Sequence, residues 1–129
     1  MPASHGRNFF FYGTLTDRPT LVHVLGRPLP AESLSPARLD GFRRVHLGGS
    51  PYPTLAAAPG QSTAGLLVQG INRAMRAKLE RYEGPLYALI EVTVVVPGEG
   101  PVRASAFVAR MADKVSDRPW IPAAKRDRR

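Results

Sequence analysis

The chain of 129 residues is long enough for one domain with a substantial core and too short for two independent domains. Its 43% hydrophobic and 22% charged residues are typical of a soluble globular protein, and the absence of cysteine excludes disulfides, cysteine-ligated metals and thiol nucleophiles. The formal net charge of +8 fits either a solvated basic surface or attraction to anionic partners, and it says nothing about the fold.

The predicted elements begin with a short buried strand at Arg7–Tyr12, after residues 1–6, which we expect to be loose. The strand stops at Gly13, where the chain can turn. Thr16 or Asp17 can cap a following helix, which Gly26 ends. The apolar residues of this helix have helical spacing and are Leu21, Val22 and Leu25.

The middle of the chain predicts several short strands separated by turns. The extended segments are Ala37–Leu39, Phe42–Leu47, Pro53–Ala57 and Ala64–Val68. Residues with turn chemistry separate them, and these are Asp40-Gly41, Gly48–Pro51 and Pro59-Gly60.

A second helix and a hairpin follow. Asn72 is a good N-cap for a helix that runs to about Tyr82. The segment Tyr87–Val96 is rich in Val and Ile and is the strongest strand signal in the chain. The turn at 97–101 joins it to Val102–Ala109 as a hairpin.

After Arg110 the sequence is polar and interrupted by proline, with Trp120 as a docking point. We therefore expect a single domain at 7–121 and a basic, disordered tail at 122–129. Strands outnumber helices and occur at hairpin spacing, which favours an α+β fold with a mainly antiparallel, curved sheet. No stretch reaches the ~18 apolar residues of a membrane helix. We expect a cytoplasmic protein with no membrane partner.

The first candidate site segment is Tyr12-Gly13-Thr14-Leu15, at the end of the first predicted strand. Glycine at a strand end lets a ligand approach the backbone closely. Backbone N–H groups before a helix start form a concave site for an anion. Joins of this kind are also common in purely structural roles, so the segment alone predicts only a possible binding turn.

The second candidate is Glu83, at or just past the end of the second helix. Its immediate neighbours are aromatic, aliphatic or glycine residues. It is therefore a loop carboxylate in water or paired with a nearby arginine, or a desolvated carboxylate with a raised pKa. A carboxylate of the second kind can transfer protons near neutral pH. Two other carboxylates compete. Glu80 pairs in sequence with Arg76, and Glu91 shares a strand face with Tyr87.

Other site chemistries have no support in the sequence. The three histidines lack metal-ligand spacing, and they are His5, His23 and His46. There is neither a phosphate-binding loop nor a dinucleotide motif, and no serine has a nucleophile-elbow signature around it. We therefore predict no metal and no cofactor.

The chain resembles the gamma-glutamylcyclotransferase-like family, also known as the avirulence-induced-gene-like cyclotransferases. Tyr12-Gly13-Thr14-Leu15 is similar to the family's substrate loop, and Glu83-Gly84 with Tyr87 is similar to its Glu-Gly-x-x-Tyr segment. Three further segments fall in the expected order, and they are Gly41–Arg43, Tyr52–Leu55 and Gly65–Val68. The resemblance covers about Phe9 to Val108. It implies a small, partly open, mainly antiparallel β-barrel flanked by about two helices.

The resemblance also implies an activity. Family members release 5-oxoproline from a γ-glutamyl amide by attack of its own α-amine, with a glutamate as acid/base. The resemblance assigns Glu83 to proton transfer. It assigns the binding of a γ-glutamyl amine or peptide to Tyr12, Gly13, Thr14, Leu15 and Tyr87. Many bacterial members carry an arginine just after the position of Tyr87, where this chain has Ala88 and Leu89.

Two other classes stay open. A non-catalytic member of the same fold would bind a small amine-bearing ligand without turnover. A basic nucleic-acid-binding module is less favoured, because aromatic and basic positions are not interleaved along the strands. The oligomeric state is not predicted.

Overall fold

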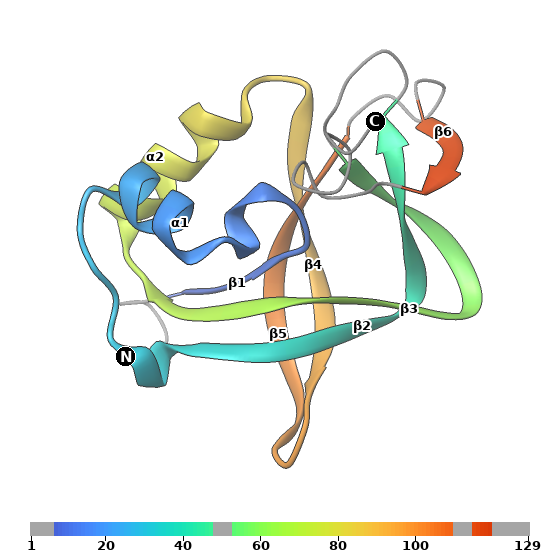
Figure 1. Ribbon diagram of the computed structural model, residues 1–129, viewed down its shortest axis with the longest axis horizontal. Helices are drawn as coiled ribbons and strands as arrows, with labels where there is room; N and C mark the ends of the chain where they lie inside the picture. Colours follow the sequence, from blue (N-terminus) through green and yellow to red (C-terminus); the bar gives the residue numbers. More distant parts are fainter. Residues whose placement is uncertain (1–6, 48–52, 110–114, 120–129) are drawn as a thin grey trace, which may run out of the picture.

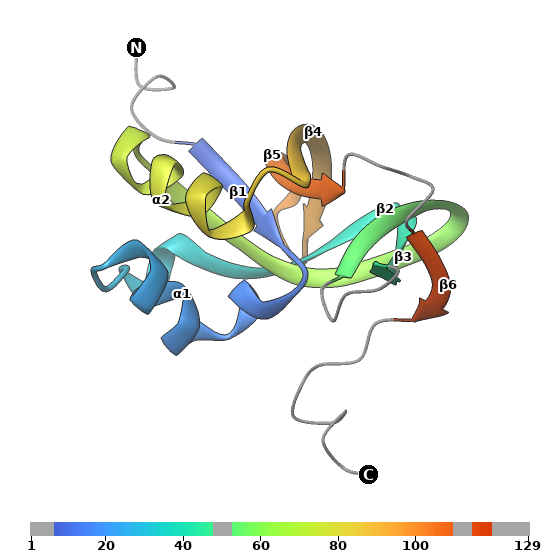
Figure 2. The same ribbon diagram turned by 90° about the horizontal axis from the view of Figure 1, so that it is seen from above.

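The computed structural model describes residues 7–47, 53–109 and 115–119. In this part of the chain, five strands form a closed barrel with two helices on one side, and a sixth strand lies on the opposite side (Figures 1 and 2). The strands are β1 (Arg7–Phe11), β2 (Leu34–Leu47), β3 (Pro53–Ile71), β4 (Tyr87–Val96), β5 (Gly100–Ala109) and β6 (Val115–Pro119), and the helices are α1 (Arg18–Leu25) and α2 (Arg73–Glu83). The predicted α+β class and the β-barrel are confirmed.

The sheet order is β3-β1-β5-β4-β2-β6, and an additional β2–β3 pairing closes the ring. Every pairing is antiparallel except the one between β1 and β5. The ring is thus closed, whereas the resemblance implied a partly open barrel. Two of its seams are nevertheless thin, because β1 pairs with β5 only at Phe9 and Ser105, and β2 pairs with β4 only at Arg38 and Val95.

Two of the predicted turns are wrong, because β2 and β3 each run continuously through them. Gly41 has a φ of +88° and Gly60 a φ of +85°, values that glycine adopts without strain. The register shifts here, since Asp40 pairs with Ser62 and Phe42 pairs with Ala57. These glycines bend the paired strands as an irregularity of the bulge type and do not end them.

The helix boundaries follow the predicted capping residues. The Asp17 carboxylate accepts a 3.1 Å hydrogen bond from the backbone N–H of Thr20, and Gly26 ends α1 with a φ of +77°. Asn72 caps α2 by accepting a 2.9 Å hydrogen bond from the N–H of Met75. No helix in the described ranges has the length and hydrophobicity needed to cross a membrane.

The side chains of β1 alternate between two hydrophobic clusters. Phe9 and Phe11 pack with residues of the helices, whereas Phe10 and Tyr12 pack inside the barrel. The other members of the helix-side cluster include Leu15, Leu21, Leu25, Ile71, Met75, Leu79, Tyr87 and Phe107. The end of β1 therefore delivers Tyr12 to the place where the two clusters meet.

The strand β6 is absent from the sequence prediction, which treats the chain after Arg110 as irregular. β6 pairs with the end of β2, with Val45 opposite Pro119 and Leu47 opposite Val115. The predicted docking of Trp120, the turn at Gly48–Pro51 and the two predicted loose ends, 1–6 and 122–129, lie outside the described residues.

Candidate active site

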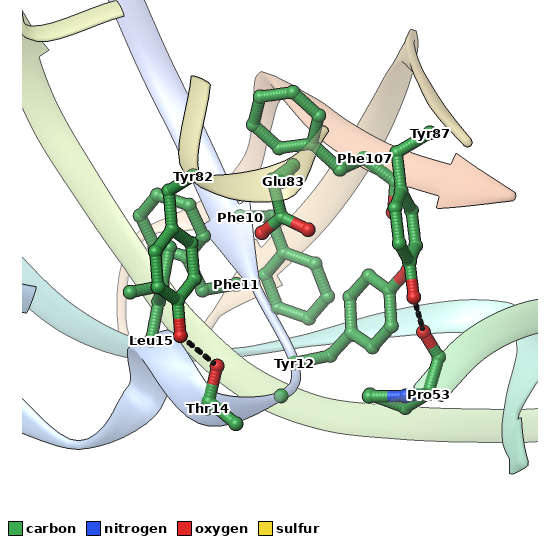
Figure 3. A pocket seen from close by; sticks show the side chains of 11 residues that line it. Phe10, Phe11, Tyr12, Thr14, Leu15, Pro53, Tyr82, Glu83, Tyr87 and Phe107 are labelled. Carbon is green, nitrogen blue, oxygen red and sulfur yellow. Dashed lines mark hydrogen bonds between the residues drawn. The ribbon is translucent and has the colours of Figure 1, made fainter. Parts of the chain in front are cut away.

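A cavity of about 140 Å³ lies where the end of β1, the end of α2 and the start of β3 meet (Figure 3). It is lined by Phe10, Phe11, Tyr12, Gly13, Thr14, Leu15, Pro53, Tyr82, Glu83, Tyr87 and Phe107. All six site residues predicted from the sequence are in this set. The structure thus brings the two separate sequence motifs to one cavity, while the individual roles of these residues stay predictions.

Glu83 is the last residue of α2, and its carboxylate points into the cavity between Tyr82 and Tyr87 (Figure 3). Gly84 ends the helix with a φ of +85°, and its carbonyl accepts a 3.3 Å hydrogen bond from the N–H of Tyr87. No ion pair with Glu83 occurs among the described residues. Burial raises the pKa of Glu83 to about 7, so the group exchanges protons near neutral pH.

Tyr12 forms one wall of the cavity, and a hydrogen bond from its hydroxyl to β5 holds it in place. Its buried hydroxyl donates a hydrogen bond to the carbonyl oxygen of Phe107. Burial, followed by the charges on Tyr87 and Glu83, raises the pKa of Tyr12 well above its ordinary value. The Tyr12 phenol is therefore neutral at physiological pH.

Tyr87 forms the opposite wall and fixes the start of β3. Its hydroxyl donates a 2.8 Å hydrogen bond to the carbonyl oxygen of Pro53 (Figure 3). The adjacent Thr54 is buried, and its Oγ1 accepts a 2.9 Å hydrogen bond from the backbone N–H of Ala109. These bonds tie β3, β4 and β5 together at the edge of the cavity.

The turn after β1 is a single 3-10 turn, Thr14–Thr16, that starts at Gly13. The carbonyl of Gly13 accepts hydrogen bonds from the N–H and the hydroxyl of Thr16, at 3.0 and 2.6 Å. The N–H groups at the start of such a turn have no partner within it, and Gly13, Thr14 and Leu15 supply them here. The turn can therefore offer several donors to an anion.

Gly13 is required by its neighbour. A Cβ atom at this position would lie 2.8 Å from Cγ of Pro53, closer than real Cβ contacts. Pro53 and Gly13 both line the cavity, so the absent side chain lets the β1 turn and the start of β3 approach each other there.

The sequence prediction misses one prominent residue of the site. It uses Tyr82 as the approximate end of the second helix, whereas the residue lines the cavity and is 43% exposed. The Tyr82 hydroxyl and the Thr14 Oγ1 share a 3.0 Å hydrogen bond, which joins the end of α2 to the turn along one side of the cavity (Figure 3). Its position directly before Glu83 was the one signal available in the sequence.

The competing carboxylates lie elsewhere. Glu80 forms the predicted helix pair with Arg76, at 3.1 Å. Glu91 is exposed and pairs with Arg103 at 2.6 Å, so it points to solvent and does not share the burial of Tyr87. Within the described ranges, no group of three or more His, Cys, Asp or Glu residues is placed to hold a metal ion. The cavity thus combines the partly buried carboxylate of Glu83 with the backbone of the turn at Gly13, Thr14 and Leu15.

The described residues thus form a small closed barrel in which the partly buried Glu83 carboxylate shares a cavity with the glycine turn after β1. The family described as "Gamma-glutamyl cyclotransferase, AIG2-like" matches residues 9–125. The chain belongs to this family.

Individual relatives show how far the likeness extends. The chain is 31% identical over 94 residues to protein AIG2 C of Arabidopsis thaliana, a match that covers 73% of this chain and 54% of the relative. The chain thus spans about half the length of that curated relative. A solution structure of an Arabidopsis thaliana protein is similar with a TM-score of 0.72, at 24% identity, over 91% of this chain and 68% of the other. A solved gamma-glutamyl cyclotransferase has a TM-score of 0.65, at 20% identity, over 86% and 69%. The two structural matches show a shared fold.

Proposed function

We propose that this protein is a γ-glutamyl cyclotransferase that converts a γ-glutamyl amide into 5-oxoproline and a free amine. The observation that supports this most strongly is the carboxylate of Glu83, which is partly buried in a cavity, has a pKa raised to about 7 and faces the Tyr12–Leu15 turn. Membership of the AIG2-like cyclotransferase family supports the same reaction.

The proposed reaction is an internal acyl transfer. Glu83 takes a proton from the substrate α-ammonium, and the resulting amine attacks the γ-carbonyl carbon to close a five-membered ring. When the bond from that carbon to the leaving nitrogen breaks, Glu83 passes this proton to the departing amine. The ring nitrogen then loses its second proton through Glu83 to the same amine, which leaves as an ammonium ion. Because nucleophile and electrophile belong to one molecule, holding the substrate folded can supply up to about 7–11 kcal/mol of the barrier reduction.

The remaining cavity residues bind and orient in this scheme. The N–H groups of Gly13, Thr14 and Leu15 hold the substrate α-carboxylate or the oxyanion that develops on the γ-carbonyl. Tyr12 and Tyr87 form the walls, and their hydroxyls already bond to backbone carbonyls of the barrel. They shape the cavity without competing for the transferred proton.

The test is a set of γ-glutamyl compounds incubated with the purified protein, with mass-spectrometric detection of 5-oxoproline. The set contains γ-glutamyl dipeptides, a glutathione-like tripeptide, γ-glutamyl-lysine and simple γ-glutamyl alkylamides. We expect release of 5-oxoproline and the matching amine from at least one compound. Calorimetric binding of these compounds without any release would instead identify a non-catalytic member of the fold.

The rate should depend on pH through Glu83. The carboxylate form is the base, and its pKa is raised to about 7, so protonation below that pH removes the active form. We expect kcat/KM to fall about tenfold for each pH unit below pH 7. A profile measured from pH 5 to 9 on the best substrate checks this, and a rate that stays flat between pH 5 and 7 would contradict it.

Substitution of Gly13 should damage the site more than the fold. In Gly13→Ala, the new Cβ must push away Pro53, which lies 2.8 Å from its position, so the turn and the cavity wall separate. We expect kcat/KM to fall by about 10- to 100-fold, with the far-ultraviolet circular dichroism unchanged. Gly98→Ala, in the exposed β4–β5 turn, serves as a control for a general loss of stability. Its φ of +84° strains an alanine, but its Cβ would meet nothing within 4 Å and it does not line the cavity.

A further inference from the structure

Arg44 lies beside the turn that the proposed function uses. It comes from β2, opposite Leu55 of β3, and its Nη1 donates a 2.7 Å hydrogen bond to the carbonyl oxygen of Tyr12. The side chain is partly buried, and this burial lowers the pKa of Arg44 from its ordinary value. A guanidinium nevertheless keeps its charge at every pH at which the protein works. Arg44 therefore places a cation against the backbone of the turn.

The accepting oxygen belongs to the peptide bond between Tyr12 and Gly13. No cis peptide bond occurs among the described residues, and in a trans peptide the C=O and the following N–H point in opposite directions. Because Arg44 holds the Tyr12 oxygen, the Gly13 N–H points away from Arg44. Tyr12 and Gly13 line the cavity, whereas Arg44 is not among its lining residues, which supports a Gly13 N–H directed to the cavity side.

This peptide needs an external constraint. Gly13 has a φ of −128° and a ψ of −133°, and glycine can reach many other combinations. If the peptide rotated, it would present a carbonyl oxygen to the cavity, which repels an anion. A charge-assisted hydrogen bond is stronger than a neutral one, and it also polarises the N–H at the other end of the same peptide.

We propose that Arg44 is a positioning residue, which fixes the Tyr12–Gly13 peptide so that the Gly13 N–H faces a bound carboxylate or oxyanion. The identity of the ligand rests on the proposed function, whereas the orientation of the peptide rests on the geometry alone.

The kinetic test compares Arg44→Met, which removes the donor, with Arg44→Lys, which keeps a charged donor. We expect kcat/KM for 5-oxoproline release to fall by at least about 10-fold in the Met variant and to stay within about 3-fold of the native protein in the Lys variant. Arg38→Met is the control, since Arg38 lies on the same strand and pairs with Asp40 at an exposed position. An equal loss in Arg38→Met, or no loss in Arg44→Met, would overturn the assignment.

A second readout does not depend on turnover. In a ¹⁵N-labelled sample, the Gly13 amide resonance should shift when 5-oxoproline is added, and this shift should shrink at least about 5-fold in Arg44→Met. If the native protein binds 5-oxoproline at Gly13 but releases none from any substrate, the proposed enzyme function fails and the inference about Arg44 stands. An unchanged response of Gly13 in the folded Met variant rejects the inference. Should Arg44→Met not fold, Arg44→Val, which also removes the donor and suits a strand position, takes its place.

Discussion

Glu83→Gln is expected to lower 5-oxoproline release by at least about 100-fold while leaving the barrel intact. The amide has nearly the shape of the carboxylic acid and fits the same cavity, but it cannot accept the substrate proton. Single-turnover and steady-state assays on the best substrate measure the loss. Glu80→Gln is the matched control, because Glu80 lies on the same helix in an exposed pair with Arg76. Activity in Glu83→Gln near that of Glu80→Gln would refute the assignment of Glu83.

The same substitution should also change stability in a defined direction. A folded-state pKa raised from 4.5 to about 7 means that the folded chain binds the proton more tightly than the unfolded chain. The free energy of unfolding therefore falls as the pH rises from about 4.5 to 7, by about 3 kcal/mol in total. Above pH 7, Glu83→Gln should therefore be more stable than the native protein. Urea titrations of both proteins at pH 5 and pH 8 test this, because the advantage of the Gln variant should be larger at pH 8.

Gly65→Ala is expected to be among the most destabilising substitutions in the barrel. A Cβ at this position would lie 2.2 Å from the backbone oxygen of Phe11 and 2.6 Å from the ring of Phe10, and neither the backbone nor the buried ring can move freely. We expect a loss of about 3 kcal/mol or more in the free energy of unfolding. The strand β1 must shift for the methyl group to fit, so activity falls as well.

Gly60→Ala on the same strand tests the cause of that loss. Its Cβ would meet nothing within 4 Å, although its φ of +85° strains an alanine by about 1–2 kcal/mol. Urea unfolding should rank Gly65→Ala clearly below Gly60→Ala. The opposite ranking would show that backbone conformation, and not the close packing of β3 against β1, determines the effect.

The elements with local signals were predictable. The N-caps Asp17 and Asn72 and the stop at Gly26 act within a few residues, so the sequence alone located both helices. The continuity of β2 and β3 was not predictable, because a glycine with positive φ ends a strand or bends it according to what the partner strand does. The strand β6 forms by pairing with the edge of β2, and nothing in its own polar sequence indicates that pairing.

The features of the site also separate into those that could be predicted from the sequence and those that could not. Two sequence motifs supplied the six residues that the cavity brings together, because each motif is a contiguous segment. The contacts that shape the cavity join residues far apart in sequence, as between Thr14 and Tyr82, Tyr87 and Pro53, and Arg44 and Tyr12. No local pattern encodes these pairings, and they appear only when β1, β2, β3, β4 and α2 come together.

The thin seams of the barrel limit how this site can diversify. Where β1 and β5 share a single backbone pair, the Tyr12 hydroxyl adds a side-chain link to Phe107, and the Tyr87 hydroxyl links β4 to β3 in the same manner. Replacing either tyrosine to admit a different substrate would also loosen the barrel. The hydrogen bond between Thr14 and the exposed Tyr82 does not join two strands of the barrel. Changes of ligand preference in this fold should therefore arise by substitution of Thr14 or Tyr82, while Tyr12 and Tyr87 are retained.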